Sequence, residues 1–100
     1  MGPMTDLAAR LADLAARGQT MTYGALAREL GWRVSDLTTA LERLMEDDAR
    51  ADHPQRAAVL EGRLSGGLPA PGFFLKLAEL GIHPADPAAW IADTRARLRR

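Results

Sequence analysis

The chain contains no cysteine among its 100 residues. This absence excludes disulfide bonds, thiolate metal ligands and a cysteine nucleophile. The chain also lacks a run of about 18 apolar residues that would form a transmembrane helix, and Met1 to Asp13 lacks the apolar segment of a signal peptide. We therefore expect a cytoplasmic protein with no membrane partner.

No charge of one sign dominates, because 13 basic and 13 acidic residues give a formal net charge of zero. Phosphate neutralisation favours a basic surplus, so any binding of duplex DNA must depend on a local basic patch.

Side-chain patterns for metal binding and catalysis are also missing. His53 and His83 stand alone beside prolines, and no H-x-x-x-H pair or acidic triad has the spacing of metal ligands. Ser35 and Ser65 lack the surroundings of a nucleophile elbow. We expect no metal, no cofactor and no enzymatic activity.

The length indicates a single domain over residues 1–100, with a disordered start at residues 1–4. Apolar spacing predicts a first helix over 6–17, capped by Thr5. A second helix is expected over 23–30, between a Thr22 cap and a Gly31 stop, and a third over 36–48, capped by Ser35. The short turn between the last two is typical of a helix-turn-helix.

The stretch after these helices predicts a small β wing. Arg56 to Leu64 is an apolar run expected to be extended, and Ser65-Gly66-Gly67 is a turn signal. Two prolines in residues 68–72 restrict a return strand to a sheet edge. The fold class predicted is therefore mainly α with a small β wing, a winged helix-turn-helix followed by C-terminal helices.

Two more helices are expected at the C-terminal end. Residues 73–80 form the first, with Phe73 and Phe74 as core anchors. The second covers 86–100, where Asp86 caps and Pro87 opens the helix. Its Trp90 stripe is a candidate surface for homodimerisation, and its arginines form a basic tail.

Two segments resemble a known family. Thr22-Tyr23-Gly24-Ala25-Leu26-Ala27 is similar to the T-Y-G-x-I/L-A segment of the alkylguanine-DNA alkyltransferases and alkyltransferase-like proteins. Arg56 to Ser65 resembles their R-V-V-N-x-x-G-x-I/L-S segment, and Leu75 to Gly81 resembles the stretch that follows it. The resemblance spans residues 20–81.

The resemblance implies a winged helix that binds the minor groove of DNA, with Tyr23 at the position of a tyrosine that helps to rotate out a damaged nucleotide. Three positions depart from the family. Ser35 stands at its arginine, Pro54 at its reactive cysteine or tryptophan, and Val59 at its asparagine. Without a thiolate, alkyl transfer is excluded.

Two functions therefore remain open. The first is a non-enzymatic DNA-binding protein that could serve in regulation, for which the candidate contact residues are Tyr23, Arg33, Ser35, Thr39, Arg43, Arg56 and Arg63. The alternative is a protein–protein interaction module on a winged-helix scaffold, because Asp36, Glu42 and Glu46 on the same face repel phosphate.

Overall fold

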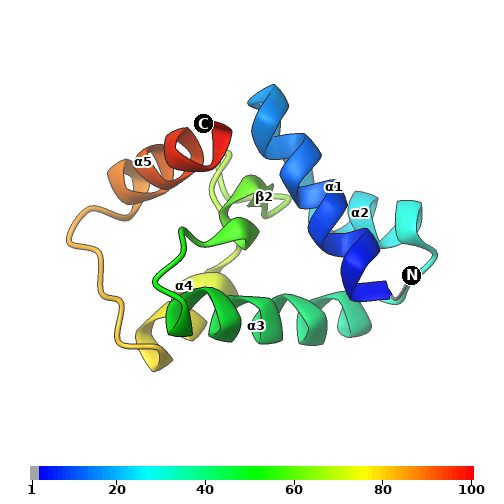
Figure 1. The fold of residues 1–100 in the computed structure, drawn as a ribbon, viewed down its shortest axis with the longest axis horizontal. Coiled ribbons are helices and arrows are strands. Elements are labelled where there is room, and N and C mark those ends of the chain that lie inside the picture. Colours follow the sequence, from blue (N-terminus) through cyan, green and yellow to red (C-terminus); the bar gives the residue numbers. More distant parts are fainter. Residues whose placement is uncertain (1–2) are drawn as a thin grey trace.

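The computed structural model describes residues 3–100 and confirms a mainly helical chain (Figure 1). The elements, in chain order, are α1 (Pro3–Arg17), β1 (Met21–Thr22), α2 (Tyr23–Leu30), α3 (Val34–Arg50), η1 (Arg56–Val59), β2 (Leu60–Glu61), α4 (Pro71–Glu79) and α5 (Pro87–Arg99). Within the described residues, no helix is both long and apolar enough to cross a membrane.

Helix α1 begins earlier than the sequence predicts, at Pro3. Proline is accepted in the first turn of a helix, because the N–H that it lacks has no helical partner there. The prediction of a disordered start is therefore wrong for residues 3 and 4, and residues 1 and 2 lie outside the described residues. Thr5 lies inside the helix instead of capping it.

The predicted α2 is confirmed at both ends. The Thr22 side chain accepts a hydrogen bond from the Ala25 N–H at 3.2 Å, which satisfies one of the free amides of the first turn. Gly31 adopts a φ of 73°, a left-handed conformation that ends the helix and that glycine adopts without a steric penalty.

Helix α3 starts at Val34, so Ser35 is not its cap. Arg33 occupies the capping position without a side-chain hydrogen bond. A backbone hydrogen bond of 3.1 Å from the Leu37 N–H to the Arg33 carbonyl closes this earlier turn. Residues 31–33 therefore separate α2 from α3, whereas the predicted helix bounds leave residues 31–35 between them.

The expected β hairpin over residues 56–72 does not form. Arg56–Val59 is a 3₁₀ turn, and only Leu60–Glu61 is a strand. This strand pairs in parallel with β1, in the register Met21 to Leu60 and Thr22 to Glu61. Residues 62–68 form a loop that a 2.8 Å hydrogen bond from Gly62 to Leu68 closes, and α4 starts at Pro71.

Two features explain why no return strand pairs with β2. Pro69 and Pro71 have no N–H to donate to a ladder. The Arg95 guanidinium of α5 donates to the carbonyls of Ala58 at 2.7 Å and of Gly67 at 2.8 Å, so these groups bind a side chain. The prediction that Arg95 belongs to an exposed basic tail is therefore wrong.

Helix α5 starts as predicted, because the Asp86 carboxylate accepts from the Ala89 N–H at 3.1 Å. Trp90 is half-buried and packs on Phe73, with ring centroids 6.3 Å apart. The proposed dimer surface is thus partly used inside the chain, and homodimerisation stays a prediction.

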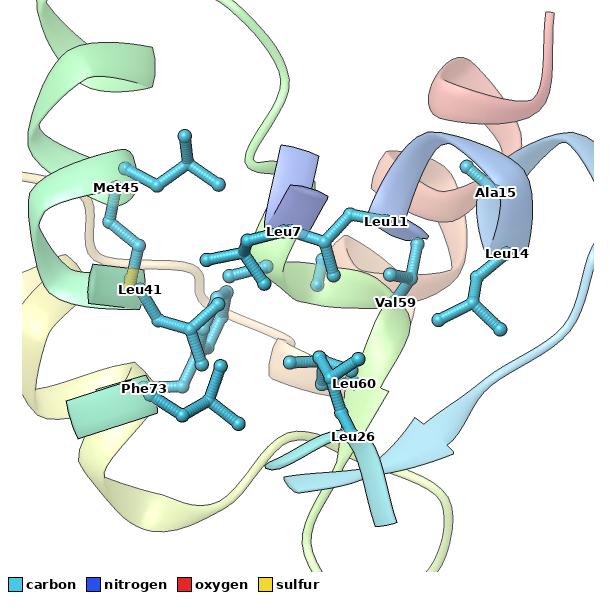
Figure 2. Close-up of a cluster of buried hydrophobic side chains, with 14 of the residues drawn as sticks. Leu7, Leu11, Leu14, Ala15, Leu26, Leu41, Met45, Val59, Leu60 and Phe73 are labelled. Atoms are coloured by element: carbon cyan, nitrogen blue, oxygen red, sulfur yellow. The ribbon is translucent and has the colours of Figure 1, made fainter. Parts of the chain in front are cut away.

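The core gathers side chains from every helix (Figure 2). Leu7, Leu11 and Leu14 of α1 project onto η1 and β2, where Val59 and Leu60 are also buried. Figure 2 places Leu41 and Met45 of α3 at one edge of this cluster, beside Phe73 of α4. Each fully buried leucine contributes about 1.5–3 kcal/mol relative to an exposed one, so this shared core fixes α3 against α4.

Candidate nucleic-acid interface

The exposed face of α3 carries four of the residues that the sequence singles out. Arg33 precedes its first turn, and Ser35, Thr39 and Arg43 are exposed along its length. Asp36 and Glu42 are exposed on the same helix, as expected. The face is therefore of mixed charge, with a cation near each end of the segment 33–43.

The hydroxyl groups on this face already donate to the helix itself. Thr39 donates to the Ser35 carbonyl at 3.1 Å, and Thr38 donates to the Val34 carbonyl at 3.0 Å. Their oxygen atoms can still accept a hydrogen bond. Thr39 is thus an acceptor towards an outside partner.

The arginines of the chain fall into two groups. Outside the helix-turn-helix, Arg10, Arg17, Arg56 and Arg97 bind a carboxylate, and on α3 Arg50 binds Asp47. In the part of the chain that the structure describes, the arginines whose side chains have no ion pair or hydrogen bond are Arg28, Arg33, Arg43, Arg63, Arg99 and Arg100. Arg28, Arg33 and Arg43 lie on the α2–α3 unit, so these three cations are available to an outside anion.

Arg56 has a different environment from the other candidates. Its guanidinium contacts the buried carboxylate of Asp48, with Nη2–Oδ1 at 2.7 Å and Nε–Oδ1 at 2.9 Å. Its backbone N–H donates to the same carboxylate at 2.9 Å. Arg56 therefore links η1 to the end of α3, and its positive charge is balanced by the buried carboxylate of Asp48.

Tyr23 is half-buried at the start of α2, and its hydroxyl accepts from the Ala70 N–H at 3.1 Å. Burial raises the pKa of this phenol above its usual value, and the Ala70 hydrogen bond and the charge of Arg95 lower it to a lesser extent. Tyr23 thus holds the loop before α4, while one side of it lines a groove between α3 and α4.

Arg63 lies apart from the α3 group. It is exposed in the loop that follows β2, and Figure 1 shows β2 across the core from α3. The structure therefore brings Arg33, Ser35, Thr39 and Arg43 together on one helix, with Tyr23 at its edge, and leaves Arg56 and Arg63 outside that group.

Three residues of the surface escape the sequence analysis. Arg28 is exposed on α2 and was treated only as part of a helix. Val34 and Leu75 are apolar and exposed, at 51% and 70%. Leu75 could have been found, because it is a large apolar residue that directly follows the predicted core anchors Phe73 and Phe74 and so points to another side of the helix.

Comparisons with protein-family models, with curated proteins and with solved structures gave no match. Among the described residues, no group of three His, Cys, Asp or Glu side chains is arranged to hold a metal ion.

Proposed function

We propose that this chain is a non-enzymatic protein that binds duplex DNA through the α2–α3 helix-turn-helix. The proposal rests on one observation: Arg33, just before α3, and Arg43, on α3, are exposed and have no carboxylate partner among the described residues, whereas Arg10 and Arg17 of α1 are both paired. An arginine that is not already paired with a carboxylate can bind a phosphate group by two parallel hydrogen bonds from its guanidinium.

The start of α3 supports the same surface. Its first turn has no side-chain cap, so its free N–H groups can donate hydrogen bonds to an anion beside Arg33. Arg33 and Arg43 are ten residues apart, which corresponds to about 15 Å along the helix axis. Both can therefore reach phosphates of one duplex.

The acidic residues set the expected strength of binding. Asp36 and Glu42 lie between the two arginines and reduce the local positive potential. With about two or three phosphate contacts, from Arg33, Arg43 and the free N–H groups at the start of α3, we expect a non-specific dissociation constant of about 10⁻⁴–10⁻⁶ M. We also propose that the scaffold is a distant relative of the alkyltransferase-like winged helix, with the loop at residues 62–70 in place of the wing.

Fluorescence anisotropy of a labelled duplex tests this function. Log affinity should fall linearly with log salt, with a slope of about −2 to −3. The double variant Arg33→Ala/Arg43→Ala should lose most of the affinity. Its matched control is Arg17→Ala/Arg97→Ala, which removes the same charge from exposed positions on α1 and α5. Equal losses in the two double variants would exclude the α3 surface.

A further inference from the structure

A groove of about 480 Å³ runs between α3 and α4, beside the proposed DNA surface. Its floor is formed by Leu41 and Met45 of α3 and by Phe73 of α4, which Figure 2 shows at the edge of the core. The lining is mostly apolar, and the hydroxyl oxygen of Tyr23 already accepts a hydrogen bond from the Ala70 N–H. The groove therefore offers a ready site for apolar side chains.

Both walls of the groove expose a large apolar residue. Val34 on α3 is 51% exposed, and Leu75 on α4 is 70% exposed. In the described residues, the remaining exposed large apolar side chain is Leu64, which is 96% exposed and does not line this groove. Two such residues facing one apolar groove indicate a surface that a partner covers.

We propose that this groove binds an amphipathic helical segment of a partner protein whose apolar side chains are flanked by Lys or Arg. The walls are the helices α3 and α4, whose backbone groups are already paired within each helix. A bound segment cannot add to a strand there, so it must satisfy its own backbone hydrogen bonds. A helix does this and presents apolar residues on one face.

The charge at the rim selects the flanking residues. Glu42 and Glu79 line the groove, and Lys76 between the walls is held by Glu46 at 2.8 Å and by Glu79 at 3.3 Å. The hydrogen bond to Glu46 raises the pKa of Lys76, so this amine stays protonated, and its charge is balanced by the two carboxylates that it contacts. Carboxylates outnumber ammonium groups at the rim, which attracts a basic helix and repels the phosphates of DNA.

A selection from phage-displayed helical peptides tests the proposal. The apolar positions and the residues beside them are randomised, and peptides are selected on the wild-type protein. Enriched peptides should carry apolar residues at i, i+3, i+4 and i+7 with Lys or Arg next to them. No enrichment, or enrichment of acidic flanks, would overturn the proposal.

Matched variants locate the binding site of the enriched peptides. Leu75→Glu, on the wall, should weaken binding by about tenfold or more. Leu64→Glu makes the same change at an exposed leucine outside the groove and should leave binding unchanged. Equal effects of these two variants would place the peptide elsewhere and refute the proposal.

The same variants report the other possible occupants. If Leu75→Glu abolishes a concentration-dependent dimer in sedimentation, a second copy of this chain occupies the groove and the proposal fails. If Leu75→Glu abolishes duplex binding while Leu64→Glu does not, DNA occupies the groove, and the proposal fails again. If Arg33→Ala/Arg43→Ala loses duplex binding and Leu75→Glu keeps it, DNA does not occupy the groove. This result supports the proposal that the groove binds the peptide.

Discussion

Removing the Arg56 side chain should destabilise the fold strongly, although this arginine lies partly at the surface. Arg56→Ala leaves the carboxylate of Asp48, which is 2% exposed, without its guanidinium partner. The backbone N–H of Arg56 remains at 2.9 Å, and His53 lies further away, at 3.7 Å. One buried negative charge then has a single close donor.

Removing one member of a buried ion pair typically costs about 3–5 kcal/mol. Because the Arg56 side chain is 31% exposed, we expect the lower end, about 3 kcal/mol. A chain of this size has a total stability of about 5–15 kcal/mol, so the loss is a large fraction of it. It corresponds to a decrease in Tm of at least about 12 °C.

Arg50→Ala is the matched control. Arg50 holds Asp47 at 3.2 Å, but the two side chains are 76% and 50% exposed. Such an exposed pair contributes about 0.5 kcal/mol or less. Urea denaturation followed by circular dichroism gives both values, and the m value should not change, because the folded core is the same.

A double variant separates the ion pair from other effects. Asp48→Asn/Arg56→Met has no charge at either position and keeps an oxygen that can accept the backbone N–H. It should recover at least half of the stability lost in Arg56→Ala. A loss below about 1 kcal/mol in Arg56→Ala, or equal losses at Arg56 and Arg50, would refute this reasoning.

The remaining predictions concern the loop before α4 and its anchor. Gly62→Ala should destabilise the fold in urea denaturation, because a Cβ atom there would meet the Ser65 hydroxyl and would lie 3.1 Å from the Ala70 backbone; Gly24→Ala meets open space on α2 and should be neutral or stabilise by up to about 1 kcal/mol. If Gly24→Ala lost more stability than Gly62→Ala, the close contacts that the structure shows around Gly62 would be contradicted. Tyr23→Phe should cost about 1 kcal/mol in the same assay, because the Ala70 N–H loses its acceptor. Because the Tyr23 pKa is raised on folding, its stabilising effect is complete below pH of about 10 and is lost as the pH rises through the folded-state value. Stability of Tyr23→Phe should therefore fall less in this alkaline range, and parallel curves for the two proteins would contradict the assignment.

Local signals predicted the helices well, since each signal acts within a few residues. Thr22 and Gly31 fix the ends of α2, and Asp86 with Pro87 fixes the start of α5. Each of these residues satisfies or frees a backbone group of its own helix. The ends of these helices can therefore be predicted without knowledge of the tertiary structure.

The region after α3 could not be predicted in the same way, because its contacts come from distant residues. Arg95 lies on α5, yet it takes the carbonyls of Ala58 and Gly67 that a hairpin would have used. Leu60 is extended because it pairs with Met21, far away in the sequence. An apolar run followed by a glycine turn does not encode either contact.

The sequence predicted which residues are candidates for the site, but it did not predict which of them are bound by other side chains of the same chain. Exposure of Arg43 follows from the helical period of α3, and Arg33 lies in the polar turn before this helix, so both residues could be found from the sequence. The pairing of Arg56 with Asp48 could not, because it depends on how the chain turns between α3 and η1. The groove needed both α3 and α4 to be in place.

Amide chemical shifts of the isotope-labelled protein, recorded during titration with a short duplex, test the central proposal most directly. We predict a continuous set of amide shift changes from Arg33 to Arg43, which become smaller as salt is added. Shift changes confined to the end of α5, near Arg99 and Arg100, would contradict the proposal, as would no change at all with the duplex in excess.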